Sequence, residues 1–338
     1  MGIETEFRAI VVDRTEDADG KKSQRATLRV IDDAFLMPGD VTIAVDYSSI
    51  NFKDGLALMG RPGVVRSWPL IAGIDLVGTV EQSADPRWSA GDQVILNGAG
   101  LSETHHGGLA ERARVSGASL VRLPEGISPA QAAAIGTAGF TAMLSVLGLE
   151  RAGVTPEAGA VLVTGAAGGV GSIAVALLAA RGYQVHASTG RMTELGDYLH
   201  GLGAVELVDR NTLSEAGKPL QGQRWAGAID SVGSFTLANV LAQTTYGGAV
   251  TSCGLAQGAD LPATVMPFIL RAVSLIGINS VEAPLPQREE AWHRLRTDLD
   301  LGLLDSLTQV IPLEAAFDAA AGILAGTLHG RTVVDVRA

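Results

Sequence analysis

Short apolar runs separated by turn residues fill the first third of the chain and predict β-strands. Proline, glycine and aspartate mark the turns, for example in Pro38-Gly39-Asp40. The predicted strands are Phe7–Val12, Ala26–Val30, Val41–Ile50, Ile74–Gln82, Gln93–Asn97 and Ala110–Val115. Ser128 followed by Pro129 is typical of a helix N-cap with proline at the first position, so a helix is predicted from there to Leu149.

From residue 160 onward, strand-like and helix-like segments alternate, which is the order of a doubly wound parallel sheet. The predicted strands are Ala160–Thr164, Gln184–Ser188, Glu206–Val208, Gly227–Asp230, Ala249–Cys253 and Ser274–Asn279. The tail has helical patterns at Gln287–Asp300 and Leu313–Ala325 and an apolar run at Thr332–Val336. We expect that last run to return to the sheet of the first domain.

Composition narrows the class of protein. A chain of 338 residues, 47% hydrophobic and 18% charged, is long enough for two domains with large buried cores. A net charge of −11 without a basic stripe argues against a nucleic-acid partner. The single cysteine, Cys253, excludes an intramolecular disulfide and a cysteine-cluster metal site. No apolar run approaches membrane-spanning length, so we expect no membrane partner and a cytoplasmic location.

The turn after Ala160–Thr164 carries the most specific signal. Gly165, Gly168 and Gly171 follow at intervals of three residues, where side chains would block a tight turn or the approach of backbone N–H groups to a pyrophosphate. An apolar stripe at helical spacing comes next, formed by Val170, Ile173, Ala174, Leu177 and Leu178. The pattern favours a dinucleotide site over a turn without a ligand. The expected contacts here are Ala167, Gly168, Gly169 and Val170.

The end of the following strand indicates which dinucleotide binds. An NAD site carries an acid there for the ribose hydroxyls, but no acid occurs between Thr164 and Glu194. Ser188, Thr189 and the Gly190 N–H can donate to a phosphate, and Arg191 can pair with it. The alternative is that Arg191 lies on a solvated loop. The sequence favours NADPH.

Further segments carry a resemblance to a known family. Gly73-Ile-Asp-Leu-Val-Gly78-Thr-Val80, Ala90-Gly-Asp and Gly107-Gly-Leu-Ala-Glu111 resemble, in this order, segments of the medium-chain dehydrogenases and reductases. Ser49-Ile-Asn51-Phe-Lys53-Asp54 and Gly330-Arg-Thr332 resemble the acrylyl-CoA reductase branch, which is quinone oxidoreductase-like. The resemblance implies an α/β fold, with a GroES-like β-rich catalytic domain at 1–127 and 281–338. It implies a doubly wound Rossmann domain for NADPH at 128–280.

The chain departs from the zinc-dependent members of this superfamily. Ile74-Asp75 stands where those enzymes have a metal-ligating His-Glu pair, and residues 48–53 contain no cysteine. Catalytic zinc needs three protein ligands and an open position, so no metal is expected. His105 and His106 are adjacent, and in an extended segment they point to opposite faces. We therefore expect a loop or substrate-pocket role for them and no metal site.

Without a metal, the expected chemistry is hydride transfer to an activated double bond, with the protein stabilising the enolate and supplying a proton. By resemblance, Tyr47, Asn51 and Arg331 are the candidate catalytic residues, and Tyr47 also contacts the coenzyme. Each residue also has an alternative without a catalytic role: a half-buried aromatic on a strand for Tyr47, a turn residue for Asn51 and a surface position for Arg331. Further coenzyme contacts implied by the resemblance are Arg210, Leu255, Ile269 and Ser280. For Lys53 and Asp54 the structural alternative is that they simply pair with each other.

Two functions share this site. The first is NADPH-dependent reduction of the C2=C3 bond of short 2-enoyl-CoA thioesters, with acrylyl-CoA giving propionyl-CoA. Arg61 and Arg66 are then candidates for the coenzyme A phosphates, with a solvated loop as the alternative. The second is reduction of enones or quinones. A third hypothesis is a coenzyme-binding protein without turnover. The predicted edge strand Ser274–Asn279 favours a homodimer.

Overall fold

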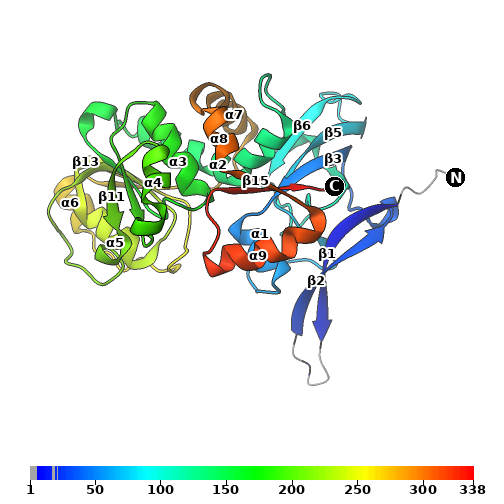
Figure 1. Cartoon of the computed structure of the whole chain (residues 1–338), viewed down its shortest axis with the longest axis horizontal. Coiled ribbons are helices and arrows are strands. Elements are labelled where there is room, and N and C mark those ends of the chain that lie inside the picture. Colours follow the sequence, from blue (N-terminus) through cyan, green and yellow to red (C-terminus); the bar gives the residue numbers. More distant parts are fainter. Residues whose placement is uncertain (1–5, 17–19, 21) are drawn as a thin grey trace. The chain divides into compact units, whose positions relative to one another are not determined.

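The computed structural model describes residues 6–16, 20 and 22–338. They divide into two compact units. Unit 1 comprises Met1–Thr137, Ser280–Glu290 and Leu304–Ala338, and unit 2 comprises Ala138–Asn279 and Ala291–Leu303. Figure 1 shows both units coloured along the chain.

Unit 1 is rich in β structure. Its larger sheet has the order β15-β16-β3-β5-β6-β8, and β7 also pairs with β3. A smaller sheet has the order β2-β1-β4. The elements of this unit are β1 (Phe7–Glu16), β2 (Lys22–Ile31), β3 (Val41–Ser49), α1 (Phe52–Leu58), β4 (Leu70–Ile71), β5 (Asp75–Ser83), β6 (Gln93–Asn97), β7 (Arg112–Val115), β8 (Val121–Arg122), β15 (Thr308–Pro312), α9 (Ala316–Ala325) and β16 (Arg331–Asp335).

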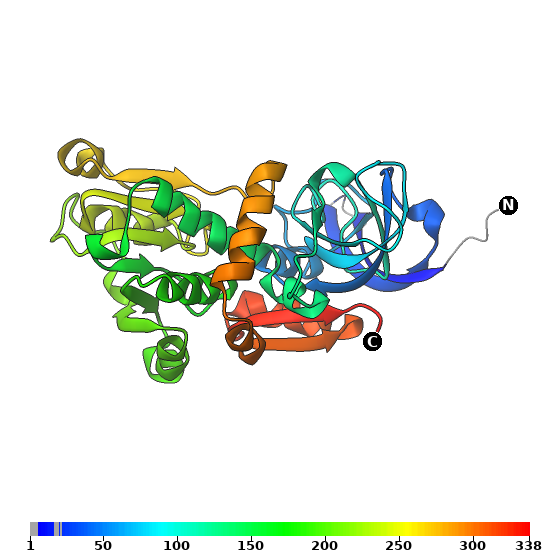
Figure 2. The ribbon, with the colours of Figure 1, turned by 90° about the horizontal axis from the view of Figure 1, so that it is seen from above.

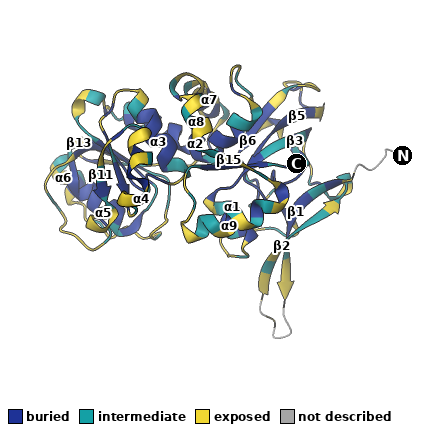
Figure 3. Ribbon diagram, in the orientation of Figure 1, coloured by how far each residue is buried: buried dark blue, intermediate teal, exposed yellow. Residues whose placement is uncertain are grey.

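The tail of the chain completes the larger sheet, as its apolar pattern predicted. β16 pairs antiparallel with β3, placing Val333 opposite Ser49 and Asp335 opposite Tyr47. Val333 and Val334 are buried. Figure 3 shows the buried strands of this sheet and the exposed outer ends of β1 and β2. The pairing brings residues from positions 47–51 and 331–335 together in one unit.

Unit 2 is a doubly wound parallel sheet with the order β11-β10-β9-β12-β13-β14. Its elements are β9 (Val161–Val163), α3 (Gly169–Ala180), β10 (Val185–Thr189), α4 (Met192–Gly201), β11 (Ala204–Asp209), β12 (Trp225–Asp230), α5 (Ser234–Gln243), β13 (Thr244–Ser252), α6 (Met266–Arg271) and β14 (Ser274–Gly277). The central strand β9 is wholly buried, as its apolar run predicted. Figure 2 shows α6 and β14, both gold, at one margin of this unit, in agreement with the place of β14 at the end of the sheet.

Three helices run through the points where the chain passes from one unit to the other. They are α2 (Pro129–Arg151), α7 (Leu285–Asp298) and α8 (Leu301–Ser306). The predicted start of α2 is confirmed, because Ser128 and Gln131 exchange hydrogen bonds between side chain and backbone. Gly136, with φ +49° and ψ −162°, interrupts the helical backbone just before the boundary at Thr137.

The length of α2 corrects one expectation. Within the described ranges, this helix of 23 residues is long and apolar enough to cross a membrane, although the sequence reading found no such run. In the fold, 89% of its most apolar window is buried inside the protein. The helix is therefore apolar because it is a core helix, and its sequence pattern shows no polar face.

The compact units differ in three places from the division expected at residues 127 and 281, the smallest being Ser280, which falls in unit 1. Residues 128–137 belong with unit 1, because the backbone of Ala134 and Thr137 hydrogen-bonds to side chains of that unit. Residues 291–303 belong with unit 2, where Arg294 pairs with Glu150 at 3.1 Å. Contacts that span 62 to 197 residues set these bounds, so local pattern did not reveal them.

Candidate active site

A buried carboxylate, Asp75, lies at the centre of a polar cluster in unit 1. It is the first residue of β5 and is 1% exposed. Its Oδ1 accepts from Asn97 Nδ2 at 2.7 Å and from Thr137 Oγ1 at 2.6 Å. Its Oδ2 accepts from Ser49 Oγ at 2.6 Å and from Asn51 Nδ2 at 2.8 Å. The Thr137 N–H donates to both oxygens, so the acceptor capacity of the carboxylate is filled.

A second buried carboxylate, Asp54, lies on the other side of Asn51. Its Oδ2 accepts from the Asn51 backbone N–H at 2.8 Å, which caps the first turn of α1. Its Oδ1 accepts from the Ile74 N–H at 2.9 Å. Burial, and then the neighbouring charge of Asp75, raise the pKa of Asp54 to about 7, against the effect of these donors.

The orientation of the Asn51 amide is fixed by this arrangement. Its Nδ2 lies 2.8 Å from Asp75 Oδ2 and 3.1 Å from Asp54 Oδ2. Carboxylate oxygens accept hydrogen bonds, so the amide nitrogen must face them. The amide oxygen then faces the guanidinium of Arg331, whose Nη2 donates to it at 3.3 Å.

Arg331 and Asp75 hydrogen-bond to the backbone of the two halves of α2, on either side of Gly136. Arg331 Nε donates to the Ala134 carbonyl at 2.6 Å, at the carboxyl end of the first half. Asp75 accepts from the Thr137 N–H, at the amino end of the second half. A cation and an anion therefore meet the helix ends whose dipoles they complement. The backbone at Gly136 passes so close that an added Cβ would lie 2.8 Å from Asp75 Oδ2 and 3.0 Å from Arg331 Nη2.

The structure separates the sequence-based candidates of this unit. It brings Asn51 and Arg331 together, and Arg331 is 3% exposed, so the surface alternative for Arg331 is wrong. Tyr47 lies two residues before Ser49 on β3 and hence on the same face of the strand. It is half-buried, and burial, Asp335 and Asp46 raise the pKa of its phenol. The phenol therefore stays protonated at neutral pH and can donate a hydrogen bond.

The alternative that Lys53 pairs with Asp54 is wrong. Lys53 Nζ lies 2.5 Å from Glu103 Oε1, fifty residues away in sequence, whereas Asp54 faces the interior. Adjacent residues on a helix point in different directions, which explains the separation. Arg66 Nη2 also approaches Glu103, at 3.8 Å, and both Arg61 and Arg66 are exposed.

The side chains at the position of a catalytic zinc do not fit a metal. Ile74 offers no ligand atom, and both oxygens of Asp75 are occupied by hydrogen-bond donors. The guanidinium of Arg331 lies beside them. In the described ranges, no three histidine, cysteine, aspartate or glutamate side chains group in a way that could hold a metal ion.

In unit 2 the glycine turn has the geometry that a pyrophosphate requires. Gly165 has φ +59°, and a Cβ on Gly171 would lie 2.3 Å from the Gly165 carbonyl oxygen, so neither position tolerates a side chain. Gly168 is the N-cap of α3 and contributes no side chain over the first turn. The amino end of α3 is thus open to an anion, which its N–H groups and dipole favour.

Two arginines lie at the end of β10, beside this turn. Arg191 precedes α4, and its backbone N–H donates to Thr189 Oγ1 at 3.1 Å. The side chain of Arg210 crosses Gly190 so closely that an added Cβ would lie 2.4 Å from its Nε. Arg191 also approaches Glu194 at 3.5 Å. Ser188 and Thr189 are buried at the strand end. The strand ends in hydroxyls and guanidinium groups, as its sequence predicted.

The other expected coenzyme contacts have different surroundings. Leu255 and Ile269 are 61% and 71% exposed in unit 2, although both are large and apolar. Single exposed apolar side chains are common on protein surfaces, so this exposure by itself assigns no contact. Ser280 belongs to unit 1, and its carbonyl accepts from Arg288 Nη2 at 3.3 Å.

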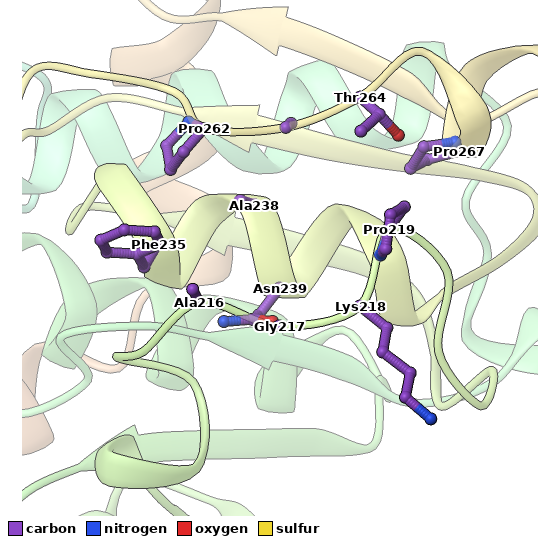
Figure 4. A pocket seen from close by; sticks show the side chains of 11 residues that line it. Ala216, Gly217, Lys218, Pro219, Phe235, Ala238, Asn239, Pro262, Thr264 and Pro267 are labelled. Carbon is purple, nitrogen blue, oxygen red and sulfur yellow. The ribbon is translucent and has the colours of Figure 1, made fainter.

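A separate hollow of unit 2 contains none of the predicted site residues. It lies between residues 216–219, α5 and residues 262–267, and has a volume of about 80 Å³ (Figure 4). Known ligand pockets occupy several hundred Å³. The amide of Asn239, on its wall, is already bonded to the backbone of Leu213 and Glu215.

The single cysteine, Cys253, is not suited to act as a nucleophile, because burial raises the pKa of its thiol to about 12.

Sequence reasoning missed Asp54, Asp75, Asn97 and Thr137. One signal was present, because Asp75 occupies the place of a metal ligand in zinc-dependent enzymes, but it was interpreted only as a missing ligand. The contacts of Asp75 with Asn97 and Thr137 span 22 and 62 residues, so the strand pairing had to be known first.

Comparisons with known proteins agree with this geometry. Residues 37–125 match the model for the alcohol dehydrogenase GroES-like domain, and residues 169–296 match that for zinc-binding dehydrogenases. The acrylyl-CoA reductase AcuI of Ruegeria pomeroyi is 48% identical over 98% of this chain and 100% of its own.

Two solved structures show the same fold. The yhdH oxidoreductase from Salmonella enterica in complex with NADP has a TM-score of 0.93 and 48% identity, over 97% of this chain and 99% of its own. Bacillus subtilis yhfP with NAD bound has a TM-score of 0.92 and 44% identity, over 98% and 100%. The chain belongs to the medium-chain dehydrogenases and reductases, in the zinc-free, quinone oxidoreductase-like branch that includes acrylyl-CoA reductase.

Proposed function

We propose that this protein is an NADPH-dependent reductase of short 2-enoyl-CoA thioesters that converts acrylyl-CoA into propionyl-CoA without a metal. Arg191 and Arg210 at the end of β10 carry the coenzyme assignment, because a 2′-phosphate needs cationic donors where NAD sites have an acid. Identity of 48% to an acrylyl-CoA reductase over nearly the full chain supports the substrate class.

The residues proposed to hold the coenzyme come from the turn and the strand end. Ala167, Gly168, Gly169 and Val170 present backbone N–H groups at the amino end of α3 to the pyrophosphate. Ser188, Thr189 and Gly190, together with the two arginines, contact the 2′-phosphate. Leu255 and Ile269 are proposed to pack against the nicotinamide, and Ser280 is a further proposed contact. When bound, NADPH supplies a hydride to the β-carbon of the thioester.

Tyr47 is proposed to stabilise the negative charge that develops on the thioester carbonyl and to supply the proton. Its phenol is protonated at neutral pH and can donate, and burial and two nearby carboxylates raise its pKa further. Arg331 is too deeply buried for a direct contact to be its main role, and we propose that it acts on the site through Asn51.

Oxidation of NADPH, followed by loss of its nicotinamide absorbance, tests this function with acrylyl-CoA, crotonyl-CoA, an enone and a quinone in parallel. We expect the highest kcat/KM with acrylyl-CoA and at least tenfold preference for NADPH over NADH. Turnover of the quinone alone would favour a quinone reductase. A Bacillus subtilis relative that is 48% identical over 88% of this chain, YhfP, carries the name quinone oxidoreductase. Coenzyme binding with no turnover in any arm would favour a binding protein.

We also propose a soluble, cytoplasmic homodimer joined along β14. This strand ends the sheet of unit 2, and its middle residues Leu275 and Ile276 are only half-buried. Pairing with a second copy would provide hydrogen-bond partners for backbone N–H and C=O groups along this edge strand. Light scattering at micromolar concentration should give twice the chain mass, and a monomeric mass would refute the proposal.

A further inference from the structure

The chemistry left to Asn51 follows from its hydrogen bonds. Both N–H groups of its amide are directed at Asp75, Asp54 and Ser49, at 2.8, 3.1 and 3.2 Å. Its Oδ1 accepts one bond, from Arg331 at 3.3 Å, and an amide oxygen has a second lone pair. The side chain is 8% exposed. Toward a ligand, Asn51 is therefore an acceptor.

We propose that Asp75 is a positioning residue that commits Asn51 to accepting a hydrogen bond from a hydroxyl or amide N–H of the bound coenzyme. Rotating the amide would bring its oxygen against the Asp75 carboxylate and would also break the bond from the amide nitrogen to Asp54 Oδ2. A ribose hydroxyl and a carboxamide N–H are such donors, whereas a thioester carbonyl is an acceptor and finds no partner here. The inference rests on the proposed function for the identity of the coenzyme and for its contact with this site.

The hydrogen-bond donors around Asp75 determine how replacing this residue affects the orientation of Asn51. Asn51 Nδ2 binds one oxygen and Asn97 Nδ2 binds the other, and neither can accept. In Asp75→Asn the new amide nitrogen must face one of them, so a buried donor meets a donor. Rotation of Asn51 relieves the conflict but turns its oxygen away from the ligand.

A swap of the two side chains offers a rescue. In the double variant D75N/N97D, the new carboxylate at 97 accepts from the new amide at 75, whose oxygen returns to Asn51. The net charge equals that of the wild type. Hydroxyls of Ser49 and Thr137 can reorient, because each both donates and accepts, and the Thr137 N–H keeps its bond to the amide oxygen that faces Asn51. The swap therefore restores the orientation of Asn51 without restoring a carboxylate at 75.

The experiment measures the Kd of NADPH by nicotinamide fluorescence, alongside the melting temperature. Loss of a buried hydrogen bond predicts that D75N raises Kd by about 10-fold or more. D75N/N97D should return to within about threefold of the wild type. In an N51A background, D75N should change Kd less than about twofold, because Asp75 acts through Asn51. Asp92→Asn, at an exposed ion pair with Arg122, is the matched control and should leave Kd unchanged.

Three results would overturn the inference. One is an equal loss from D75N with and without Asn51, which would indicate a general structural role. Another is a folded swap variant that binds NADPH as poorly as D75N. A KM for acrylyl-CoA that rises while the Kd of NADPH stays constant would also contradict it, because Asn51 would then serve the acyl substrate. Failure of the proposed function is recognised separately, since a wild type that reduces no enoyl-CoA still reports on NADPH binding.

Discussion

Replacing Asp54 with asparagine should change how the stability of this protein depends on pH. The folded protein raises the pKa of Asp54 to about 7 by burying it completely beside Asp75. In the unfolded chain the pKa returns to about 3.9. The folded state therefore binds this proton more tightly. The stabilisation is fully present below the unfolded pKa and is lost as the pH rises through 7.

The size of the effect follows from the two pKa values. Linkage gives a loss of about 2 kcal/mol between pH 5 and pH 7, and about 4 kcal/mol over the whole titration. Asparagine cannot ionise, so Asp54→Asn lacks this slope. It also places an amide nitrogen against the backbone N–H of Asn51 or Ile74, at a pH-independent cost of about 1–3 kcal/mol.

Urea denaturation at pH 5, 6, 7 and 8 measures both the pH-dependent loss of stability and the pH-independent cost of the substitution. The free energy of unfolding of the wild type, minus that of Asp54→Asn, should fall by about 2 kcal/mol from pH 5 to pH 7. Asp92→Asn is the control, because Arg122 lowers the pKa of Asp92 and its difference should be flat in this range. A flat difference for Asp54→Asn as well would refute the conclusion that Asp54 is protonated near neutrality.

Three other substitutions test the coenzyme site and the chemistry. Arg191→Ala should raise the Kd of NADPH about 10–100-fold and leave that of NADH within twofold, measured by fluorescence titration, and equal changes would contradict a phosphate contact. Gly190→Ala would place a Cβ 2.4 Å from Arg210 Nε and should weaken NADPH binding by displacing that guanidinium; an unchanged Kd would argue against a role for Arg210. Tyr47→Phe should lower kcat for acrylyl-CoA about 100-fold in steady-state assays at saturating NADPH, and an unchanged kcat would remove Tyr47 as the donor.

Much of the fold could be predicted because its signals are local. The buried run of β9, the glycines after it and the apolar stripe of α3 follow one another within about twenty residues. The hydroxyls and Arg191 at the end of β10 are local to that strand. Such patterns depend on backbone geometry and on spacing, which a single sequence contains.

The polar cluster of unit 1 could not be predicted in the same way. Asp75 is bonded to Ser49, Asn97 and Thr137, which come from three separate segments of the chain. Arg331 reaches Ala134 across 197 positions. Lys53 was assigned the wrong partner because Asp54 is adjacent in sequence and Glu103 is not. Pairing of β16 with β3 and β3 with β5 creates these contacts, so they exist only in the folded chain.

Transfer of a hydride from NADPH to the β-carbon of a short enoyl-CoA can be followed with acrylyl-CoA and NADPH deuterated at C4 of the nicotinamide. Mass spectrometry of the product should give propionyl-CoA with one deuterium at C3, formed in equal amount to the NADP⁺ released. Oxidation of NADPH without propionyl-CoA, or propionyl-CoA without deuterium at C3 from either C4 epimer, would contradict this transfer.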